Sequence, residues 1–200
     1  MISFIVTCSD IRVEDVQATV ESITALWPAA DEREIIIVDH GTGQPIIGSL
    51  MDVSDTLLYI RTHAKDKATA RNTGMNAATG SFIQLIDGGD TLALTAYNHC
   101  LDIVKYDNPD MVTLGITTPE SRRRGSLYKF FDAETGADYM RNKRPRSDIR
   151  AFIFRKSLLG GVRLGNPLTA NADYSFITAL LTRTRQIVRT EAYAYLRRLT

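Results

Sequence analysis

The sequence predicts a single α/β domain built on a mostly parallel central sheet with helices on both faces. Short apolar runs rich in β-branched residues recur along the chain, and amphipathic helical segments lie between them. Unbroken apolar runs such as residues 34–39 are typical of parallel strands covered on both faces. Two hundred residues with 44% hydrophobic content fill one core and leave little for a second.

Strands and helices alternate in the first half. Strands are expected at residues 2–7, 34–39, 57–60 and 82–87. Apolar side chains recur at helical spacing from Val13 to Trp27, behind a Ser9-Asp10 cap. An alanine-rich helix over residues 66–79 follows and ends at Gly80.

The second half is less regular. Asp90 or Thr91 is expected to cap a helix that runs to Val104, and residues 117–150 are expected to form long polar loops with one short helix near Phe130. Strands are predicted at residues 111–116 and 151–154, a helix at 173–181, and one or two closing strands at 187–195.

Charge is divided unevenly between the two halves. Residues 1–100 hold 6 of the 24 Lys and Arg and 13 of the 23 Asp and Glu, giving −7, and the remaining 18 and 10 give the second half +8. Basic clusters at residues 122–124 and 141–146 can attract phosphates, an anionic acceptor or a membrane surface. A solvated loop face explains these clusters equally well.

Other features of the sequence indicate a cytoplasmic protein. No run of eighteen apolar residues and no secretory leader is visible. Cys8 and Cys100 form no CxxC pair, so both are expected to be reduced thiols.

Polar and acidic residues follow three of the predicted strands, in the segments 7–10, 39–43 and 87–90. In an open α/β sheet, ligands bind beyond the carboxyl ends of the strands. Carboxylates there can accept hydrogen bonds from a nucleobase or ribose, and a pair can hold Mg²⁺ or Mn²⁺ against a diphosphate. Each Asp can also merely cap a turn. The chain has neither GxGxxG nor a GxxxxGK[ST] loop, which argues against a dinucleotide or P-loop site.

The order of these segments carries a more specific signal. Residues 2–10, 34–42 and 68–90 resemble successive blocks of family 2 glycosyltransferases with the GT-A fold. This resemblance implies a nucleotide-sugar donor-binding half at residues 1–95 and an acceptor-side half at 96–200. It implies a donor site that includes Thr7, Ser9, Asp39, Arg71 and Asp87.

The resemblance also implies roles for individual residues. Asp39 corresponds to the acid that binds the nucleoside base, and Arg71 belongs to an ARNxG block beside the donor. Asp87 and Asp90 stand where the family's DxD motif holds a metal on the diphosphate. Asp173 corresponds to the general base, and this role is favoured over the alternative that it only caps the helix that it begins.

Three departures from the family pattern remove acids from this site. Gly89, His40 and Ala172 stand where the family commonly has acidic residues. Asp87 and Asp90 can still share Mn²⁺ or Mg²⁺, or the metal is weak or absent. In the second case Arg71, Lys65, Lys67 or the later arginines can stabilise the leaving diphosphate instead. His40 can contact a ribose or phosphate, or satisfy its neighbours in a turn.

The resemblance implies an inverting glycosyltransferase of hexosyl or N-acetylhexosaminyl type. Its donor is expected to be a UDP-sugar, and its acceptor a surface polysaccharide or glycolipid. No nucleic-acid partner is expected, and the basic half can contact the inner face of a membrane. The alternative is a degenerate fold that binds a nucleotide or a partner without turnover; a nucleotidyltransferase ranks last.

Overall fold

The structure is a computed structural model that describes residues 1–198 except 42, 52, 55, 56, 64, 65, 122–131, 143–145 and 166–170. The strands are β1 (Ile2–Cys8), β2 (Arg33–Asp39), β3 (Leu57–Arg61), β4 (Phe82–Asp87), β5 (Thr91–Leu92), β6 (Met111–Thr117), β7 (Phe152–Arg155) and β8 (Ile187–Leu196). The α-helices are α1 (Val13–Thr24), α2 (Ile47–Leu50), α3 (Lys67–Ala77), α4 (Leu94–Tyr106), α5 (Gly136–Asn142) and α6 (Ala172–Leu181), and two 3₁₀ turns are η1 (Ile149–Ala151) and η2 (Lys156–Leu158).

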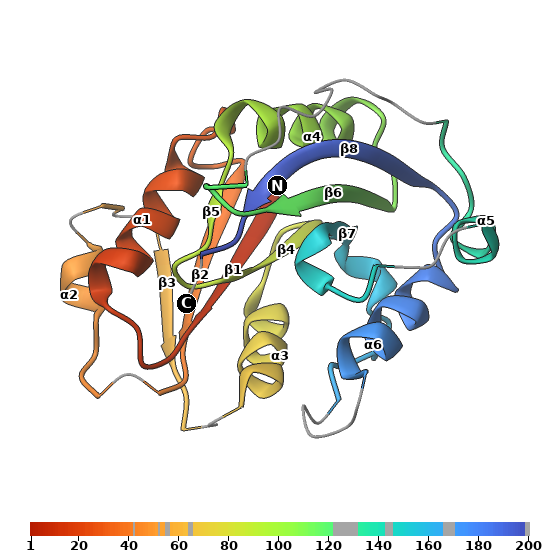
Figure 1. Ribbon diagram of the computed structural model, residues 1–200. Helices are drawn as coiled ribbons and strands as arrows, with labels where there is room; N and C mark the ends of the chain where they lie inside the picture. Colours follow the sequence, from red (N-terminus) through yellow and green to blue (C-terminus); the bar gives the residue numbers. More distant parts are fainter. Residues whose placement is uncertain are drawn as a thin grey trace.

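One sheet connects all of these strands in the order β3-β2-β1-β4-β7-β6-β8-β5 (Figure 1). Strands β3, β2, β1 and β4 run parallel, so their carboxyl ends meet at one edge. Thr7 pairs with both Val38 and Asp87, which places the ends of β1, β2 and β4 level with one another. The predicted strand ends are therefore neighbours in space.

The other side of the sheet is mixed. Strand β7 runs antiparallel to β4 and β6, β8 runs parallel to β6, and β5 runs antiparallel to β8. The predicted α/β fold with a mostly parallel sheet is confirmed, with β7 and β5 as its antiparallel members. The closing segment forms the single strand β8, whose pairing with β6 shifts register near Gly115.

Helices cover both faces of the sheet. Phe4 and Val6 of β1 pack with α1 and α4 on one face, whereas Ile5 faces the core that includes α3, α5 and α6. All three side chains are fully buried, and burying an aliphatic or aromatic side chain contributes about 1.5–3 kcal/mol. The continuous apolar runs arise because alternate residues of each strand serve different cores.

Helix α3 begins as predicted. The Asp66 carboxylate accepts the backbone N–H of Thr69 at 2.8 Å, which satisfies one of the free donors of the first turn. The predicted end is also close, since the helix stops at Ala77.

Two predicted caps are wrong. Helix α1 begins after Arg12 without a side-chain cap, because the chain turns first at Asp10, whose φ is 45°. Ala93 precedes α4, since Thr91 pairs with β8 instead of opening the helix.

Three further predictions concern irregular regions. Helix α1 ends at Thr24, and Trp27 beyond it donates its ring N–H to the backbone of Asn98. The short helix expected near Phe130 falls outside the described residues; a short helix, α5, lies at 136–142. Among the described helices, none combines the length and apolar character needed to cross a bilayer.

Candidate functional site

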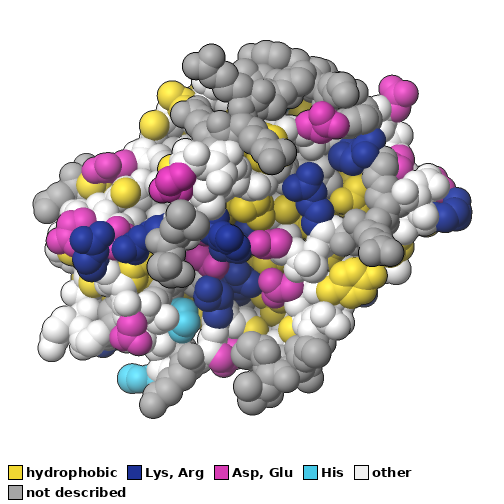
Figure 2. Space-filling model, viewed as in Figure 1, with side chains coloured by type: hydrophobic (Ala, Val, Ile, Leu, Met, Phe, Trp, Pro, Cys, Tyr) yellow, Lys and Arg dark blue, Asp and Glu magenta, His cyan; other side chains and the backbone are white. Residues whose placement is uncertain are grey.

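A cavity of about 500 Å³ opens beyond the carboxyl ends of β1 and β4, and we call it the strand-end pocket. Its walls are Thr7, Cys8, Ser9, Asp10, Ile11, His40, Lys67, Asp87, Gly88, Asp90, Arg150, Arg197 and Arg198. Figure 2 shows basic and acidic side chains gathered near the middle of this face, with a histidine beside them. The pocket lies where open α/β sheets bind ligands.

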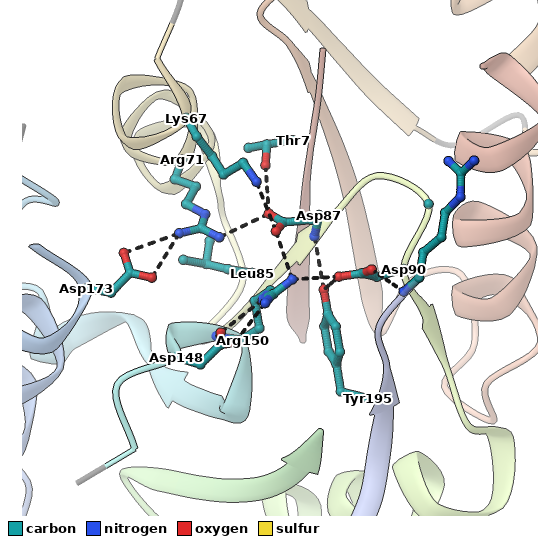
Figure 3. Close-up of polar contacts among 12 residues, drawn as sticks. Thr7, Lys67, Arg71, Leu85, Asp87, Asp90, Asp148, Arg150, Asp173 and Tyr195 are labelled. Carbon is teal, nitrogen blue, oxygen red and sulfur yellow. Dashed lines mark hydrogen bonds and ion pairs between the residues drawn. The ribbon is translucent and has the colours of Figure 1, made fainter. Parts of the chain in front are cut away.

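Asp87, the last residue of β4, is the most heavily paired acid of the pocket (Figure 3). Its Oδ1 accepts Arg71 at 3.0 Å, and its Oδ2 accepts Lys67 at 3.1 Å and Arg150 at 3.0 Å. Burial would raise the pKa of Asp87, but Arg71, Lys67 and Arg150 together hold it below its ordinary value. Asp87 is therefore a carboxylate at neutral pH.

Arg150 joins three carboxylates. One terminal nitrogen donates to Asp87 at 3.0 Å and to Asp90 at 2.9 Å. The other edge of the guanidinium binds both oxygens of Asp148, at 2.8 and 2.9 Å. Burial opposes the charge of Arg150, but Asp148 and Asp87 raise its pKa further above its ordinary value. The short turn η1 supplies this arginine from a segment that the sequence pattern assigns to loops.

Asp90 ties the last strand to the pocket. Its Oδ2 accepts the Tyr195 hydroxyl at 2.6 Å, and its Oδ1 accepts the backbone N–H of Arg198 at 2.8 Å. The same Tyr195 oxygen accepts the backbone N–H of Asp87 at 3.1 Å. Burial raises the pKa of Asp90 above its ordinary value despite these hydrogen bonds. Tyr195 is fully buried, so it acts here through its hydroxyl group and not as an exposed stacking surface.

Arg71 links the pocket to Asp173. One terminal nitrogen donates to Asp87 at 3.0 Å, and the other lies 3.4 Å from both oxygens of Asp173 (Figure 3). Asp173 stands in the first turn of α6, but Asn171 is the residue that precedes the helix. Its carboxylate points to Arg71 with 38% of the side chain exposed. The cap alternative is therefore not what the structure shows.

Asp39 is the last residue of β2 and is fully buried. Its carboxylate accepts the Tyr59 hydroxyl and the backbone N–H of Gly41, and Arg61 lies 3.9 Å away. Asp39 does not line the strand-end pocket in this conformation. Its role toward a nucleoside base stays a prediction.

His40 follows Asp39 and lines the pocket. The residue is 6% exposed, and neither ring nitrogen has a hydrogen-bond partner among the described residues. Burial, followed by the charge of Lys67, lowers the pKa of His40, so the neutral ring is favoured. The alternative in which a turn histidine only satisfies its neighbours does not fit these contacts. Most buried polar atoms in proteins have a hydrogen-bond partner, and a bound ligand or water is one partner that these two nitrogens could have.

The wall of β1 contributes hydroxyls and a thiol. Thr7 and Ser9, which the resemblance assigns to the donor site, both line the pocket, and the Thr7 hydroxyl lies 3.5 Å from Asp87. Cys8 is buried, and burial together with Asp39 raises its pKa to about 12. The thiol is therefore protonated at neutral pH.

The arrangement of Asp87 and Asp90 does not fit a bridging divalent ion. Every oxygen of the two carboxylates already accepts at least one hydrogen bond, and Arg150 stands between them. Gly89 has φ of +90°, a conformation that L side chains rarely adopt, so the chain path disfavours an acid there. Among the described residues, no group of three acidic, histidine or cysteine side chains is placed to hold a metal.

Sequence reasoning missed several functional neighbours of this pocket. Arg150 carried no signal, because its segment is an irregular basic stretch. Arg197 and Arg198 follow the closing strands predicted at 187–195, and that pattern gives them no individual role. Tyr195 is fully buried, and its hydroxyl joins the backbone of Asp87 to the carboxylate of Asp90. Lys65 lies outside the described residues.

Comparisons with known proteins agree with this geometry. Residues 3–158 match the family described as glycosyl transferase family 2. No curated protein sequence is significantly similar to the chain.

Solved structures match across nearly the whole chain. TarS 1-349 from S. aureus matches with a TM-score of 0.81 and 15% identity over 98% of this chain, and its complex with UDP-GlcNAc matches with 0.80 and 16% over 100%. The mannosyltransferase PcManGT from Pyrobaculum calidifontis, in complex with GDP-Man and Mn²⁺, matches with 0.69 and 12% over 98%. The chain spans 59%, 59% and 56% of those three chains, respectively. With the family match covering most of its length, the chain belongs to glycosyl transferase family 2.

Proposed function

We propose that this chain is an inverting glycosyltransferase that moves a sugar from a nucleoside diphosphate donor to a hydroxyl group. The observation that carries the proposal is the strand-end pocket, which combines cationic walls with hydroxyls and an unpartnered histidine in a family 2 fold. Asp173 lies next to this pocket through its ion pair with Arg71. Asp87, which lines the strand-end pocket, is thus a different residue from Asp173, which is proposed to remove the proton.

The cationic walls suit a diphosphate. Lys67, Arg150, Arg197 and Arg198 outnumber the three acids that line the same cavity. Lys and Arg form strong charge-assisted hydrogen bonds with phosphate oxygens. Thr7, Ser9 and His40 supply polar contacts for the nucleoside or ribose.

Uridine is the nucleoside that we propose. Structures of TarS in complex with UDP and UDP-GlcNAc match the whole of this chain, whereas PcManGT, which holds GDP-Man, matches with a lower TM-score. Hexose and N-acetylhexosamine donors are therefore the first to test. At 12–16% identity these likenesses concern the fold, so the choice of nucleoside is part of the proposal.

Asp173 is the proposed general base. Its carboxylate takes the proton of the acceptor hydroxyl while that oxygen bonds to the anomeric carbon. The bond between the anomeric carbon and the diphosphate breaks, and the electron pair leaves with the diphosphate oxygen. Attack from the face opposite the leaving group inverts the anomeric centre. Arg71 positions Asp173 and at the same time contacts Asp87 on the donor side.

A second cavity, near the end of β6, is large enough to receive part of an acceptor. Its volume is about 570 Å³, and Thr117, Arg146, Asp148 and Arg197 are among its walls. Arg197 also lines the strand-end pocket, so the two cavities share a wall. We propose that a surface polysaccharide or glycolipid enters here. The basic cluster at 122–124, a predicted membrane contact, lies outside the described residues.

A nucleotide-binding protein without turnover is the second candidate. The observation that favours it is Ala172, since this residue leaves Asp173 without the acidic neighbour that the family pattern predicts. Such a protein would bind UDP but release no diphosphate from any donor.

Titration with UDP and measurement of UDP release from a panel of UDP-sugars test the proposal. Lys67→Ala removes a wall cation and is expected to weaken UDP binding about tenfold, the value of one charge-assisted contact. Lys105→Ala is the matched control, because Lys105 is similarly exposed and lies over Trp27, away from the pocket. Binding without turnover favours the second candidate, and no UDP binding contradicts both.

A further inference from the structure

Arg150 occupies the place that a divalent ion would need. A metal that bridged Asp87 and Asp90 would sit about 2.0–2.2 Å from an oxygen of each. The terminal nitrogen of Arg150 already lies 3.0 Å from Asp87 Oδ2 and 2.9 Å from Asp90 Oδ2. An ion at that point would come into contact with the guanidinium, which carries the same sign of charge.

The far edge of Arg150 is anchored, so the side chain is not free to swing aside. Asp148 binds that edge through two hydrogen bonds and also accepts the backbone N–H of Arg150 at 3.0 Å. The Arg150 carbonyl accepts the side-chain amide of Gln84 at 3.0 Å, which fixes the backbone against β4. The guanidinium lies 5.6 Å from the centre of the Tyr195 ring. Admitting a metal would break several charge-assisted contacts at once.

The backbone of the loop after β4 independently disfavours a metal site. The second acid of a DxD motif would stand at position 89, where the backbone φ of +90° favours glycine. A Cβ there would also lie 3.0 Å from Ile11 and 3.1 Å from Arg198. The chain has therefore lost both the ligand and a backbone conformation that readily accepts one.

We propose that the Arg150 guanidinium replaces the divalent ion of this site, so that the chain binds the diphosphate of its donor through side-chain cations without a metal. The proposal rests on the proposed function for the identity of the ligand. Arg150 neutralises Asp87 and Asp90, which would otherwise repel the phosphates. It also lines the strand-end pocket beside Lys67 and Arg198, where the diphosphate is proposed to lie.

Two measurements on the full chain test this proposal. In the first, Mn²⁺ is titrated alone and the free ion is followed by electron paramagnetic resonance. Wild type is expected to leave Mn²⁺ free, whereas Arg150→Ala is expected to bind it through the uncovered carboxylates. In the second, UDP affinity is measured with excess Mn²⁺ and with EDTA. Wild-type affinity is expected to be equal in both, and Arg150→Ala is expected to lose about tenfold or more in EDTA.

Arg141→Ala is the control for loss of one positive charge, since Arg141 is exposed and pairs only locally with Asp138 among the described contacts. It is expected to match wild type in both measurements. Arg150→Lys is a second variant that keeps the test possible if Arg150→Ala does not fold. Lysine keeps the positive charge, so this variant should exclude Mn²⁺. Lysine lacks the planar guanidinium with donors on both edges, so the variant should bind UDP more weakly than wild type.

Wild-type binding of Mn²⁺ that Asp87→Asn abolishes would overturn the proposal, as would UDP affinity that EDTA removes. Either result leaves the proposed function standing. Failure of wild type to bind UDP in both conditions contradicts the proposed function instead, and the Mn²⁺ titration then still decides the role of Arg150.

Discussion

The two halves of the chain build the pocket with opposite charges. Strands β1, β2 and β4 deliver acids to one edge, among them Asp87, whereas Arg150, Arg197 and Arg198 arrive from the second half. The halves carry net charges of −7 and +8, and some of these opposite charges form ion pairs in the pocket. The basic excess of the second half is therefore more than a solvated loop face. Its members include the partners of buried acids.

The largest expected effect separates proton transfer from donor binding. Asp173→Asn should lower the rate of sugar transfer about 10²- to 10⁴-fold, the usual contribution of a general base, because an amide cannot take the acceptor proton. UDP affinity should change little, since Asp173 does not line the strand-end pocket. Steady-state rates and UDP titration measure the two quantities. Asp138→Asn on α5 is the control, and unchanged transfer in Asp173→Asn would remove it as the base.

The next effect tests whether the second half neutralises the first. Arg150→Ala leaves Asp87, Asp90 and Asp148 without their shared partner, and is expected to lower the free energy of unfolding by about 3–5 kcal/mol. Arg141→Ala removes an exposed pair and should cost about 0–1 kcal/mol. Urea denaturation measures both. Equal effects of the two substitutions would show that Arg150 does not neutralise the acids of the first half.

A smaller effect concerns the hydroxyl that joins β8 to the loop after β4. Tyr195→Phe keeps the ring but removes one of the hydrogen bonds to Asp90 and leaves the backbone N–H of Asp87 without its Tyr195 partner, which should cost about 1–3 kcal/mol. Tyr193→Phe, on the exposed side of the same strand, should stay within about 0.5 kcal/mol of wild type. Thermal and urea unfolding compare the pair. A neutral Tyr195→Phe would contradict a structural role for this hydroxyl.

The smallest effect is a pH dependence of stability. Burial and Lys67 lower the pKa of His40 in the folded state, so below about pH 6.5 the unfolded chain binds a proton that the folded chain does not. Stability should therefore fall as the pH drops from about 6.5 toward the lowered pKa, by at most about 1.4 kcal/mol for each unit of the shift. His40→Gln should flatten this part of the unfolding profile. His63→Gln, at an exposed position, should leave it unchanged.

Most of the first half could be predicted from the sequence. The runs at β1, β2 and β4 are continuous because both faces are buried, and the alanine-rich segment predicted as a helix forms α3. The caps of α1 and α4 could not be predicted. In the first case a turn at Asp10 intervenes, and in the second Thr91 pairs with β8, which lies about a hundred positions away along the chain.

The site was predicted in part. Thr7, Ser9 and Asp87 line the pocket, and Arg71 and Asp173 meet each other as neighbours of it. Arg150 escaped prediction because a single arginine in a basic stretch has no local pattern. Only the position of η1 beside β4 gives it three carboxylate partners.

The order of residues along the chain is enough to predict the parallel strands, the edge where their polar ends meet and the resemblance to the family. A strand that is buried on both faces has a run of consecutive apolar residues, so it can be recognised from a short segment of the sequence. Only the folded chain brings Arg150 to Asp87 and Asp90. It also places the Tyr195 hydroxyl within hydrogen-bond distance of Asp90. Ion pairing depends on distances of about 3 Å between segments remote in sequence, and no local pattern encodes such distances.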